Sequence, residues 1–364
     1  MDFPANIDPE MEPMTLFEWF VDESVLHGAL KGLPGLLLLA IIVVCIFVLS
    51  KGADWMIDGV VHLARRTGLP KIVIGATIVS LGTTTPEAIV SVMAAFMGNA
   101  GLALGNGVGS IIADTGLILG LTCILAAVPV NRFILSRMGW VQVGAATLLA
   151  VICVAIAAFS AGVPMLPRWV GIFFLILLAI YLYVSYLWAR QGSATLLLEE
   201  SQTDDRPMPA VLLCWLMIVG GLSLVIVAAR ILVPAASELA MRIGVPEDVV
   251  AATMVALGTS LPELTTAIAS VRKGHPEITL GNVVGADILN CLFVIGAAAT
   301  ARPLAIPPNF FYFHFPAMLI ILYSFRVFIA FNRKGHFRRW QGAWLLAVYL
   351  LYVGLQYGLS AGTD

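Results

Sequence analysis

Two glutamates lie in the middle of long apolar runs, and each directly follows a proline. Glu87 ends the sequence GTTTPE, and Glu263 ends the sequence GTSLPE. A proline cannot donate a hydrogen bond to the carbonyl four residues earlier, so a helix through either motif leaves one carbonyl oxygen unpaired. The threonine four positions before each glutamate shares its helical face. Each motif therefore brings a carboxylate, hydroxyl groups and a free carbonyl oxygen to one place.

Together the two motifs predict a cation site made of oxygen ligands. They supply the carboxylates of Glu87 and Glu263, the hydroxyls of Thr83, Thr84, Thr259 and Ser260, and the carbonyls of Gly82 and Gly258. Such ligands suit Ca²⁺ or Na⁺ and do not suit zinc or copper. A kinked helix whose glutamate reaches an interface would explain one motif. Two related copies, each with a glutamate inside an apolar run, favour a functional site instead.

A second pair of motifs, GNGVG at 105–109 and GNVVG at 281–285, follows the glutamates. Asn106, Ser110 and Asp114 recur at intervals of four, which places them in one stripe along a helix. The corresponding residues of the second copy are Asn282, Ala286 and Asn290, and Asp287 directly follows Ala286. Neither Asp114 nor Asp287 has an evident basic partner within its own predicted helix, so both carboxylates are predicted members of the cation site. Asp287 lies three residues before Asn290 and within reach of the same helical face, and a packing role at the edge of the site is the alternative for it.

The composition indicates an integral membrane protein. Of the 364 residues, 60% are apolar and 12% charged, and the mean hydropathy is +0.96. A soluble domain carries about twice that charged fraction. Five cysteines without CxxC or CxxH spacing and five scattered histidines indicate neither a disulfide framework nor a zinc site. The net charge of −2 offers no basic field for nucleic acid, and no Ser/His/Asp set is present, so we predict no enzyme, no cofactor and no nucleic-acid partner.

Ten apolar segments are long enough to cross a bilayer, which requires about 20 residues each. They lie at approximately 34–50 (continuing toward 64), 72–97, 102–128, 139–160, 169–188, 210–240, 249–271, 278–299, 310–330 and 340–357. One set of alternate loops between them holds thirteen lysines and arginines, and the opposite set holds four. The excess of positive charge marks the cytoplasmic side, so both termini are expected outside.

The chain also contains an internal repeat. A shift of 176 residues aligns 76–120 with 252–296 without a gap, and 16 of the 45 paired residues are identical. Each copy then holds five helices, an odd number, so the second copy must be inverted in the membrane. Inverted repeats are typical of secondary transporters, whose substrate site lies near the midplane between the copies.

The predicted fold is an all-α polytopic membrane protein with ten transmembrane helices in two inverted five-helix repeats. The expected divisions are an acidic extracellular segment at 1–33, a first repeat at 34–188, a cytoplasmic linker at 189–209, a second repeat at 210–358 and a tail at 359–364.

The paired motifs resemble the two alpha-repeats of the calcium/cation antiporter superfamily, specifically its sodium/calcium exchangers. The resemblance implies a multi-pass plasma membrane (cell inner membrane) protein that exports Ca²⁺ in exchange for Na⁺ by alternating access, its first and sixth helices sliding across the rest. By resemblance, Glu87 and Glu263 are the central Ca²⁺ ligands. The hydroxyls of Thr83, Thr84, Thr259 and Ser260 would bind Ca²⁺ and Na⁺, and Ser110, Asp114 and Asn290 would complete the site.

The chain departs from the usual exchanger pattern at the second pair of motifs. Asp114 stands where Asn is common, Asn290 where Asp is common, and Asp287 where Asn is frequent. Ala286 replaces a serine that the family uses for Na⁺, which leaves one sodium ligand and the stoichiometry open.

Three alternatives to Na⁺/Ca²⁺ exchange remain. If Glu87 and Glu263 carry protons, the chain is a Ca²⁺/H⁺ antiporter, although Asp114 favours sodium. K⁺ is a further candidate co-ion. A cation channel or a Ca²⁺ sensor that does not transport belongs to another class, and the duplicated inverted site argues against it.

Overall fold

A computed structural model describes residues 30–130, 132–160, 162–196, 209–243, 247–332 and 335–360. For 132–133, 191–196, 247–259 and 357–360 it describes the backbone only. The predicted acidic segment therefore lies almost wholly outside the described residues, as do 197–208 of the predicted linker and the last four residues of the tail.

The described chain is predominantly helical. Its α-helical and π-helical (η) elements are α3 (Gly35–Thr67), α4 (Lys71–Ile74), η1 (Gly75–Val79), α5 (Ser80–Thr83), α6 (Thr85–Phe96), α7 (Ala100–Ala113), η2 (Asp114–Leu119), α8 (Gly120–Leu125), α9 (Arg132–Phe159), α10 (Arg168–Leu196), α11 (Val211–Arg242), α12 (Glu247–Arg272), α13 (Pro276–Leu289), η3 (Asn290–Val294), α14 (Ile295–Ala301), η4 (Phe310–His314), α15 (Phe315–Ala330) and α16 (Arg339–Ser360). Two short strands, β1 (Met165–Leu166) and β2 (Leu304–Ala305), pair antiparallel.

Seven continuous helical stretches in the described residues are long and apolar enough to cross a membrane. An eighth candidate is the bent pair Lys71–Thr83 and Thr85–Phe96. Helices α12 and α16 are 26 and 22 residues long but do not meet the same criterion, so their crossing of the membrane stays a prediction.

Several helices are longer than their predicted apolar segments. Helix α9 begins at Arg132 instead of residue 139, and α3 extends without a break to Thr67. Hydropathy marks only the part of a helix that lies in hydrocarbon, whereas backbone hydrogen bonding continues into the polar ends. The ends of α3 and α10 are examples, since they carry arginines.

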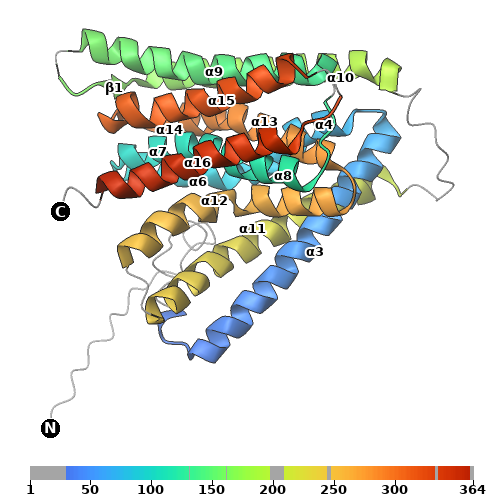
Figure 1. The fold of residues 1–364 in the computed structure, drawn as a ribbon, viewed down its shortest axis with the longest axis horizontal. Helices are drawn as coiled ribbons and strands as arrows, with labels where there is room; N and C mark the ends of the chain where they lie inside the picture. Colours follow the sequence, from blue (N-terminus) through green and yellow to red (C-terminus); the bar gives the residue numbers. More distant parts are fainter. Residues whose placement is uncertain are drawn as a thin grey trace.

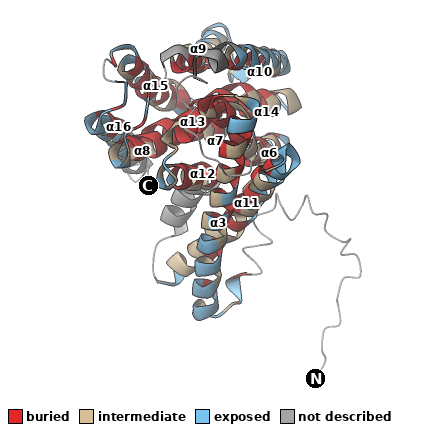
Figure 2. Ribbon diagram, turned by 90° about the vertical axis from the view of Figure 1, so that its right-hand side faces the viewer, coloured by how far each residue is buried: buried red, intermediate tan, exposed pale blue. Residues whose placement is uncertain are grey.

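Helices α3 and α11 form a pair that lies at one side of the bundle. In Figure 1 they run diagonally below most of the other helices, and the lower part of α3 is exposed in Figure 2. Glycines allow their backbones to approach closely. A Cβ atom at Gly52 would lie 2.8 Å from the carbonyl oxygen of Gly221, and one at Gly59 would lie 2.8 Å from that of Cys214.

The centre of the bundle is built from α7 and α13 with the segments that continue them. In the most apolar windows of Ala100–Leu125 and Pro276–Ala301, 72% and 83% of residues are buried, against 28% in α3 and in α11. Glycines again permit the closest contacts. A Cβ at Gly75 of η1 would lie 2.6 Å from the Ile278 carbonyl oxygen, and one at Gly285 would lie 2.6 Å from Ser80 Oγ. The polar residues on these inner elements are consequently held on a closely packed backbone.

Polar groups away from the centre have ordinary structural roles. The five cysteines are free and buried. Asp58 of α3 pairs with Lys273 at 2.6 Å, and Glu238 pairs with Arg242 on α11 at 2.8 Å. These acids are therefore paired with basic side chains near helix ends.

Candidate ion-binding site

The first glutamate motif interrupts its helix, as the proline predicts. Helix α5 ends at Thr83, α6 begins at Thr85, and the two axes differ by 41°. Pro86 lies at the start of α6, where a missing amide hydrogen costs least. Glu87 follows in the first turn of α6, so the bend places its carboxylate next to the break.

The second motif does not bend the chain in the same way. Helix α12 runs without interruption from Glu247 to Arg272, with Pro262 inside it. The hydroxyls of Thr265 and Thr266 bond the carbonyls of Leu261 and Pro262 at 2.8 and 2.6 Å, which reinforces the turn after the proline. Gly258 and Thr259 lie within α12, but their side-chain surroundings are outside the described residues. The two related motifs therefore have different backbone shapes.

The predicted ligands with described side chains are all buried. Their exposed fractions range from 0% to 6%, and they lie on four stretches of chain, α5–α6, α7–η2, α12 and α13–η3: Thr83, Thr84, Glu87, Ser110, Asp114, Ser260, Glu263, Asp287 and Asn290. Four of them are carboxylates: Glu87 interacts electrostatically with Glu263 and Asp114, and Asp114 interacts with Asp287. The fold thus brings the two glutamates and the Asp114 carboxylate of the second motif pair into one region.

Hydrogen bonds connect the halves of the chain around these acids. Thr83 Oγ1 on α5 lies 3.3 Å from Asn282 Oδ1 on α13. Asn106 Nδ2 on α7 donates to the Glu87 carbonyl at 3.1 Å and to Ser91 Oγ at 2.9 Å. Asn106 therefore supports the α6 backbone beside Glu87.

Asp114 and Asn290 are in direct contact. These residues correspond under the 176-residue shift, and Asn290 Nδ2 donates to Asp114 Oδ2 at 3.5 Å. Each is also the first residue of a π-helical segment, η2 or η3. Such segments are rare inside α-helices and are frequent at functional sites, because the wider turn displaces a side chain from its regular position. The repeat therefore produces the same local backbone at both positions.

Besides Asp287 Oδ1, six oxygen atoms of the predicted ligands have no hydrogen-bond partner among the described residues. They are Thr84 Oγ1, Glu87 Oε2, Asp114 Oδ1, Ser260 Oγ, Glu263 Oε2 and Asn290 Oδ1. Buried polar atoms are nearly always paired, so a group of unpaired acceptors indicates a place where a cation supplies the missing interactions. The described chain contains no cluster of three or more His, Cys, Asp or Glu side chains that would hold a metal by itself. A cation here therefore depends on hydroxyl and amide oxygens as well as on carboxylates.

Asp287 differs from the other predicted ligands in what it contacts. Its Oδ2 atom accepts hydrogen bonds from Thr115 Oγ1 on η2 and Gln142 Nε2 on α9, both at 2.5 Å. Neither Thr115 nor Gln142 belongs to the motifs that predict the site from the sequence. The signal for Gln142 was an uncharged amide within the apolar segment 139–160, and it is only 1% exposed. Asp287 consequently belongs to a separate hydrogen-bonded group beside the central oxygens.

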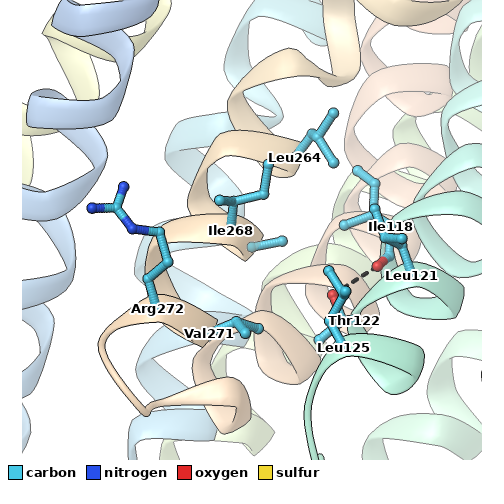
Figure 3. A pocket seen from close by; sticks show the side chains of 9 residues that line it. Ile118, Leu121, Thr122, Leu125, Leu264, Ile268, Val271 and Arg272 are labelled. Atoms are coloured by element: carbon cyan, nitrogen blue, oxygen red, sulfur yellow. Dashed lines mark hydrogen bonds between the residues drawn. The ribbon is translucent and has the colours of Figure 1, made fainter. Parts of the chain in front are cut away.

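An apolar pocket lies between α12 and the segment formed by η2 and α8. Its lining residues are Ile118, Leu121, Thr122, Leu125, Leu264, Ala267, Ile268, Val271 and Arg272. Figure 3 shows the apolar side chains of η2 and α8 on one side of the pocket and those of α12 on the other, whereas Arg272 points away. The guanidinium of Arg272 instead donates to Ser50 Oγ on α3 at 3.1 Å. Under the 176-residue shift the corresponding pair is α6 and α14, which pack against each other.

The sequence of the chain matches that of a known protein family. The chain matches the sequence profile described as "Sodium/calcium exchanger protein" over residues 37–187 and 213–358. The chain belongs to the sodium/calcium exchanger family. This membership confirms the resemblance expected from the two motif pairs, and it makes the chain a multi-pass membrane protein of an ion-antiporter family and not of an enzyme family.

Relatives within the exchanger family cover nearly the whole chain. It is 34% identical over 333 residues to inner membrane protein YrbG of Escherichia coli, covering 89% of this chain and 98% of YrbG. It is 30% identical to the uncharacterized membrane protein MJ0091 of Methanocaldococcus jannaschii, covering 85% and 94%. Sodium/calcium exchanger MaX1 of Methanosarcina acetivorans is 26% identical, with 84% and 94% covered.

A solved exchanger has a similar fold. The sodium-calcium exchanger NCX_Mj, soaked with Na⁺ and Sr²⁺, matches with a TM-score of 0.73 and 26% identity. The match covers 88% of this chain and 99% of that exchanger. The exchanger fold thus extends beyond the two motif pairs to most of the present chain.

Proposed function

We propose that this protein exports Ca²⁺ in exchange for Na⁺ and that the cation binds among the buried oxygens around Glu87 and Glu263. The observation that carries the proposal is the set of six unpaired oxygens contributed by α6, α12, η2, η3 and the residue between α5 and α6. Ca²⁺ takes six to eight oxygen ligands in flexible geometry, which suits such a mixed set. MaX1 is named a sodium/calcium exchanger, and structures of NCX_Mj were obtained with Na⁺, Ca²⁺ or Sr²⁺, which supports the same two ions here.

The charge of the site explains why exchange is favoured over a leak. Glu87, Glu263 and Asp114 place three carboxylates in one buried region. Either one divalent cation or several monovalent cations can balance most of that charge, whereas an empty site would carry uncompensated buried charge. The ion site would therefore become accessible from the opposite side of the membrane only when cations occupy it. This requirement couples the movement of Ca²⁺ in one direction to that of Na⁺ in the other.

Differences between the two repeats support alternating access. The α8–α12 interface contains an apolar pocket, whereas its repeat-related counterpart, α6–α14, is packed. In the opposite state of an inverted-repeat transporter these two interfaces would exchange their shapes. The closely packed α3–α11 pair would slide as one body across the remaining helices. This proposal includes ten spans, with repeats at 34–188 and 210–358 and a cytoplasmic linker between them.

The orientation and location follow from the loop charges. The thirteen-to-four excess of lysine and arginine places the linker in the cytoplasm and the amino terminus outside. YrbG is named an inner membrane protein, which supports the plasma (cell inner) membrane as the site of this chain.

The decisive experiment measures ⁴⁵Ca²⁺ uptake into liposomes that contain the purified protein. Uptake is expected with an outward Na⁺ gradient and is not expected with a pH gradient alone. Uptake driven only by the pH gradient would replace Na⁺ with H⁺ as the coupling ion. Uptake that needs no counter-ion gradient would indicate a channel, and Ca²⁺ binding without any uptake would indicate a sensor.

Two substitutions test the assignment of the ligands. Glu87→Gln and Glu263→Gln keep the side-chain volume but remove a charge, so each should abolish uptake while the protein still folds. Glu277→Gln is the matched control, because Glu277 pairs with Lys71 at 3.4 Å and is not among the central oxygens. Transport at the wild-type rate by a folded Glu87→Gln or Glu263→Gln protein would show that the carboxylate is not a required ligand.

A further inference from the structure

A pocket of about 320 Å³ lies at the turn that joins α15 to α16, far along the chain from the motifs of the ion site. Its walls include Val327, Phe331, His336, Arg338 and Trp340. Helix α15 belongs to a stretch that is long and apolar enough to cross a membrane, so the turn after it lies at a membrane surface. Trp340 is 55% exposed in the first turn of α16, as is typical of tryptophans at the boundary between lipid and water. The pocket therefore lies at the level of the lipid headgroups.

The backbone of the turn directs two side chains with nitrogen donors toward the pocket. Phe337 is 2% exposed, and its amide donates to the Val128 carbonyl at 2.9 Å. An antiparallel bridge pairs Pro129 with His336, so the chain is extended here. Successive side chains of an extended chain point in opposite directions. His336 and Arg338, on either side of Phe337, therefore face away from the core, and both line the pocket.

Two buried amide side chains hold the turn in this shape. Asn332 Nδ2 donates to the His336 carbonyl at 2.9 Å, and Asn332 Oδ1 accepts from the Gly335 amide at 3.0 Å. Gln341 Oε1 accepts from the backbone amide of Arg338 at 2.8 Å. These bonds fix the backbone and leave the guanidinium of Arg338 on the surface of the pocket. The pocket is therefore preformed, which lowers the entropic cost of filling it.

The basic charge around the pocket is not compensated by acids. The sequence contains no aspartate or glutamate from 288 to 363, whereas the turn holds Arg333, Lys334, Arg338 and Arg339. In the part of the chain that the structure describes, no acid forms an ion pair with Arg338 or Arg339. The start of α16 adds to this field, because the N-terminus of a helix carries partial positive charge. An anion is therefore the complementary occupant.

An exposed apolar stripe connects the pocket with the hydrocarbon region. Its members recur at intervals of three and four residues, which places them on one face of α15 and its end: Ile320, Tyr323, Val327 and Phe331. They are 53%, 44%, 49% and 78% exposed, and the last two line the pocket. A phospholipid has both an anionic phosphate at the membrane surface and acyl chains that can lie along such a stripe. The stripe therefore favours a lipid over a soluble anion.

We propose that this pocket binds the headgroup of an anionic phospholipid, with its phosphate at Arg338 and His336 and an acyl chain along the α15 stripe. The guanidinium of Arg338 offers a fork of donors that matches phosphate oxygens, and the His336 imidazole supplies a further N–H. A zwitterionic lipid is disfavoured, because its ammonium group would approach the arginines of the turn. The proposal depends neither on the identity of the transported ions nor on the orientation of the chain in the membrane.

Lipid binding is measured on the purified protein in detergent, by native mass spectrometry over a series of lipid concentrations. Phosphatidylglycerol should bind saturably, and phosphatidylcholine with the same acyl chains should bind at least about fivefold more weakly. Glycerol 3-phosphate, which has a phosphate but no acyl chain, should not displace phosphatidylglycerol at the same concentration. Equal binding of the two lipids would overturn the preference for an anionic headgroup. Displacement by glycerol 3-phosphate would assign the pocket to a soluble anion instead.

Variants test whether the lipid occupies this pocket. Arg338→Gln keeps a polar side chain but removes one basic charge, so the affinity for phosphatidylglycerol should fall about fivefold. Arg66→Gln is the matched control, because Arg66 is also exposed but lies in the last turn of α3, and it should leave the affinity unchanged. Wild-type affinity in a folded Arg338→Gln protein, or an equal loss in Arg66→Gln, would refute the assignment. If Arg338→Gln does not fold, Phe331→Ser decides: it changes an exposed member of the stripe, and unchanged lipid binding would exclude the stripe as the acyl-chain surface.

Discussion

The contact between Asp114 and Asn290 leads to a quantitative prediction about charge at the site. The Asn290 amide donates to the Asp114 carboxylate at 3.5 Å, and the two positions are related by the internal repeat. Exchanging the residues by the double change Asp114→Asn/Asn290→Asp reverses the hydrogen bond but keeps one acid and one amide. If the total charge near the midplane governs coupling, the double variant should transport Ca²⁺. Of the single variants, Asp114→Asn should bind Ca²⁺ more weakly, and Asn290→Asp should release it more slowly.

Coulomb energies give the size of each effect. For a carboxylate about 5 Å from a bound cation, an effective dielectric constant of about 20 gives an interaction of roughly 3 kcal/mol per unit of cation charge, so the value for Ca²⁺ is at least that large. Asp114→Asn removes that interaction, so the half-saturating Ca²⁺ concentration should rise by about 100-fold or more. Asn290→Asp instead places two carboxylates about 3.5 Å apart, and their repulsion of roughly 5 kcal/mol must be relieved by a cation or a proton. This variant should bind Ca²⁺ tightly and release it slowly.

The assay is Na⁺-driven ⁴⁵Ca²⁺ uptake as a function of Ca²⁺ concentration, at matched amounts of folded protein. The double variant should return to within about tenfold of the wild-type half-saturation, because its carboxylate count is restored. A double variant no better than Asp114→Asn alone would refute the reasoning. That result would mean that the exact position of the carboxylate matters more than the total charge.

Three further predictions concern packing, ion pairing and sidedness. Gly285→Ala should lower the stability of the purified protein by about 1–3 kcal/mol, because its Cβ meets the backbone and side chain of the neighbouring helix. Gly144→Ala has open space, so in thermal unfolding it should be neutral or stabilising by up to about 1 kcal/mol; equal effects of the two changes would contradict the packing argument. Lys273→Ala should cost less than about 1 kcal/mol in the same measurement, since the ion pair with Asp58 is 26% and 42% exposed, and a larger loss would show that the pair supports the fold. Ser201→Cys, in a background without reactive native cysteines, should resist impermeant thiol reagents added outside intact cells; labelling there would overturn the predicted orientation.

The candidate ion site could be proposed from the sequence because its signals are local. A proline removes a backbone donor wherever it stands in a helix, and an acid inside an apolar run must be compensated. Both features occur twice, at Glu87 and Glu263, in alignable surroundings. The approximate helix positions follow for the same reason, since hydrophobicity is a property of consecutive residues. Hydropathy could not locate the ends of α3 and α9, where polar residues continue the helix.

The partners of individual side chains depend on contacts between distant segments. Asp287 was grouped with the ion ligands because it lies near Asn290 in the sequence, yet its hydrogen bonds run to Thr115 and Gln142. The direct bond between Asp114 and Asn290 likewise spans 176 residues. The periodicity of an α-helix predicts which of its residues share a face, but it does not predict which neighbouring helix packs against that face.

The difference between the two glutamate motifs also required the tertiary structure. The sequences GTTTPE and GTSLPE predict the same interruption, yet the chain bends by 41° after Thr83 and stays continuous through Pro262. A proline removes the same hydrogen bond in both helices, so the local cost is similar. Whether the helix then bends depends on the surrounding packing: the segment before Thr84 is packed closely against α13, and α12 lies beside the pocket that it forms with α8. The neighbouring helices therefore determine whether the chain bends, because different helices pack against the turn weakened by Pro86 and the turn weakened by Pro262.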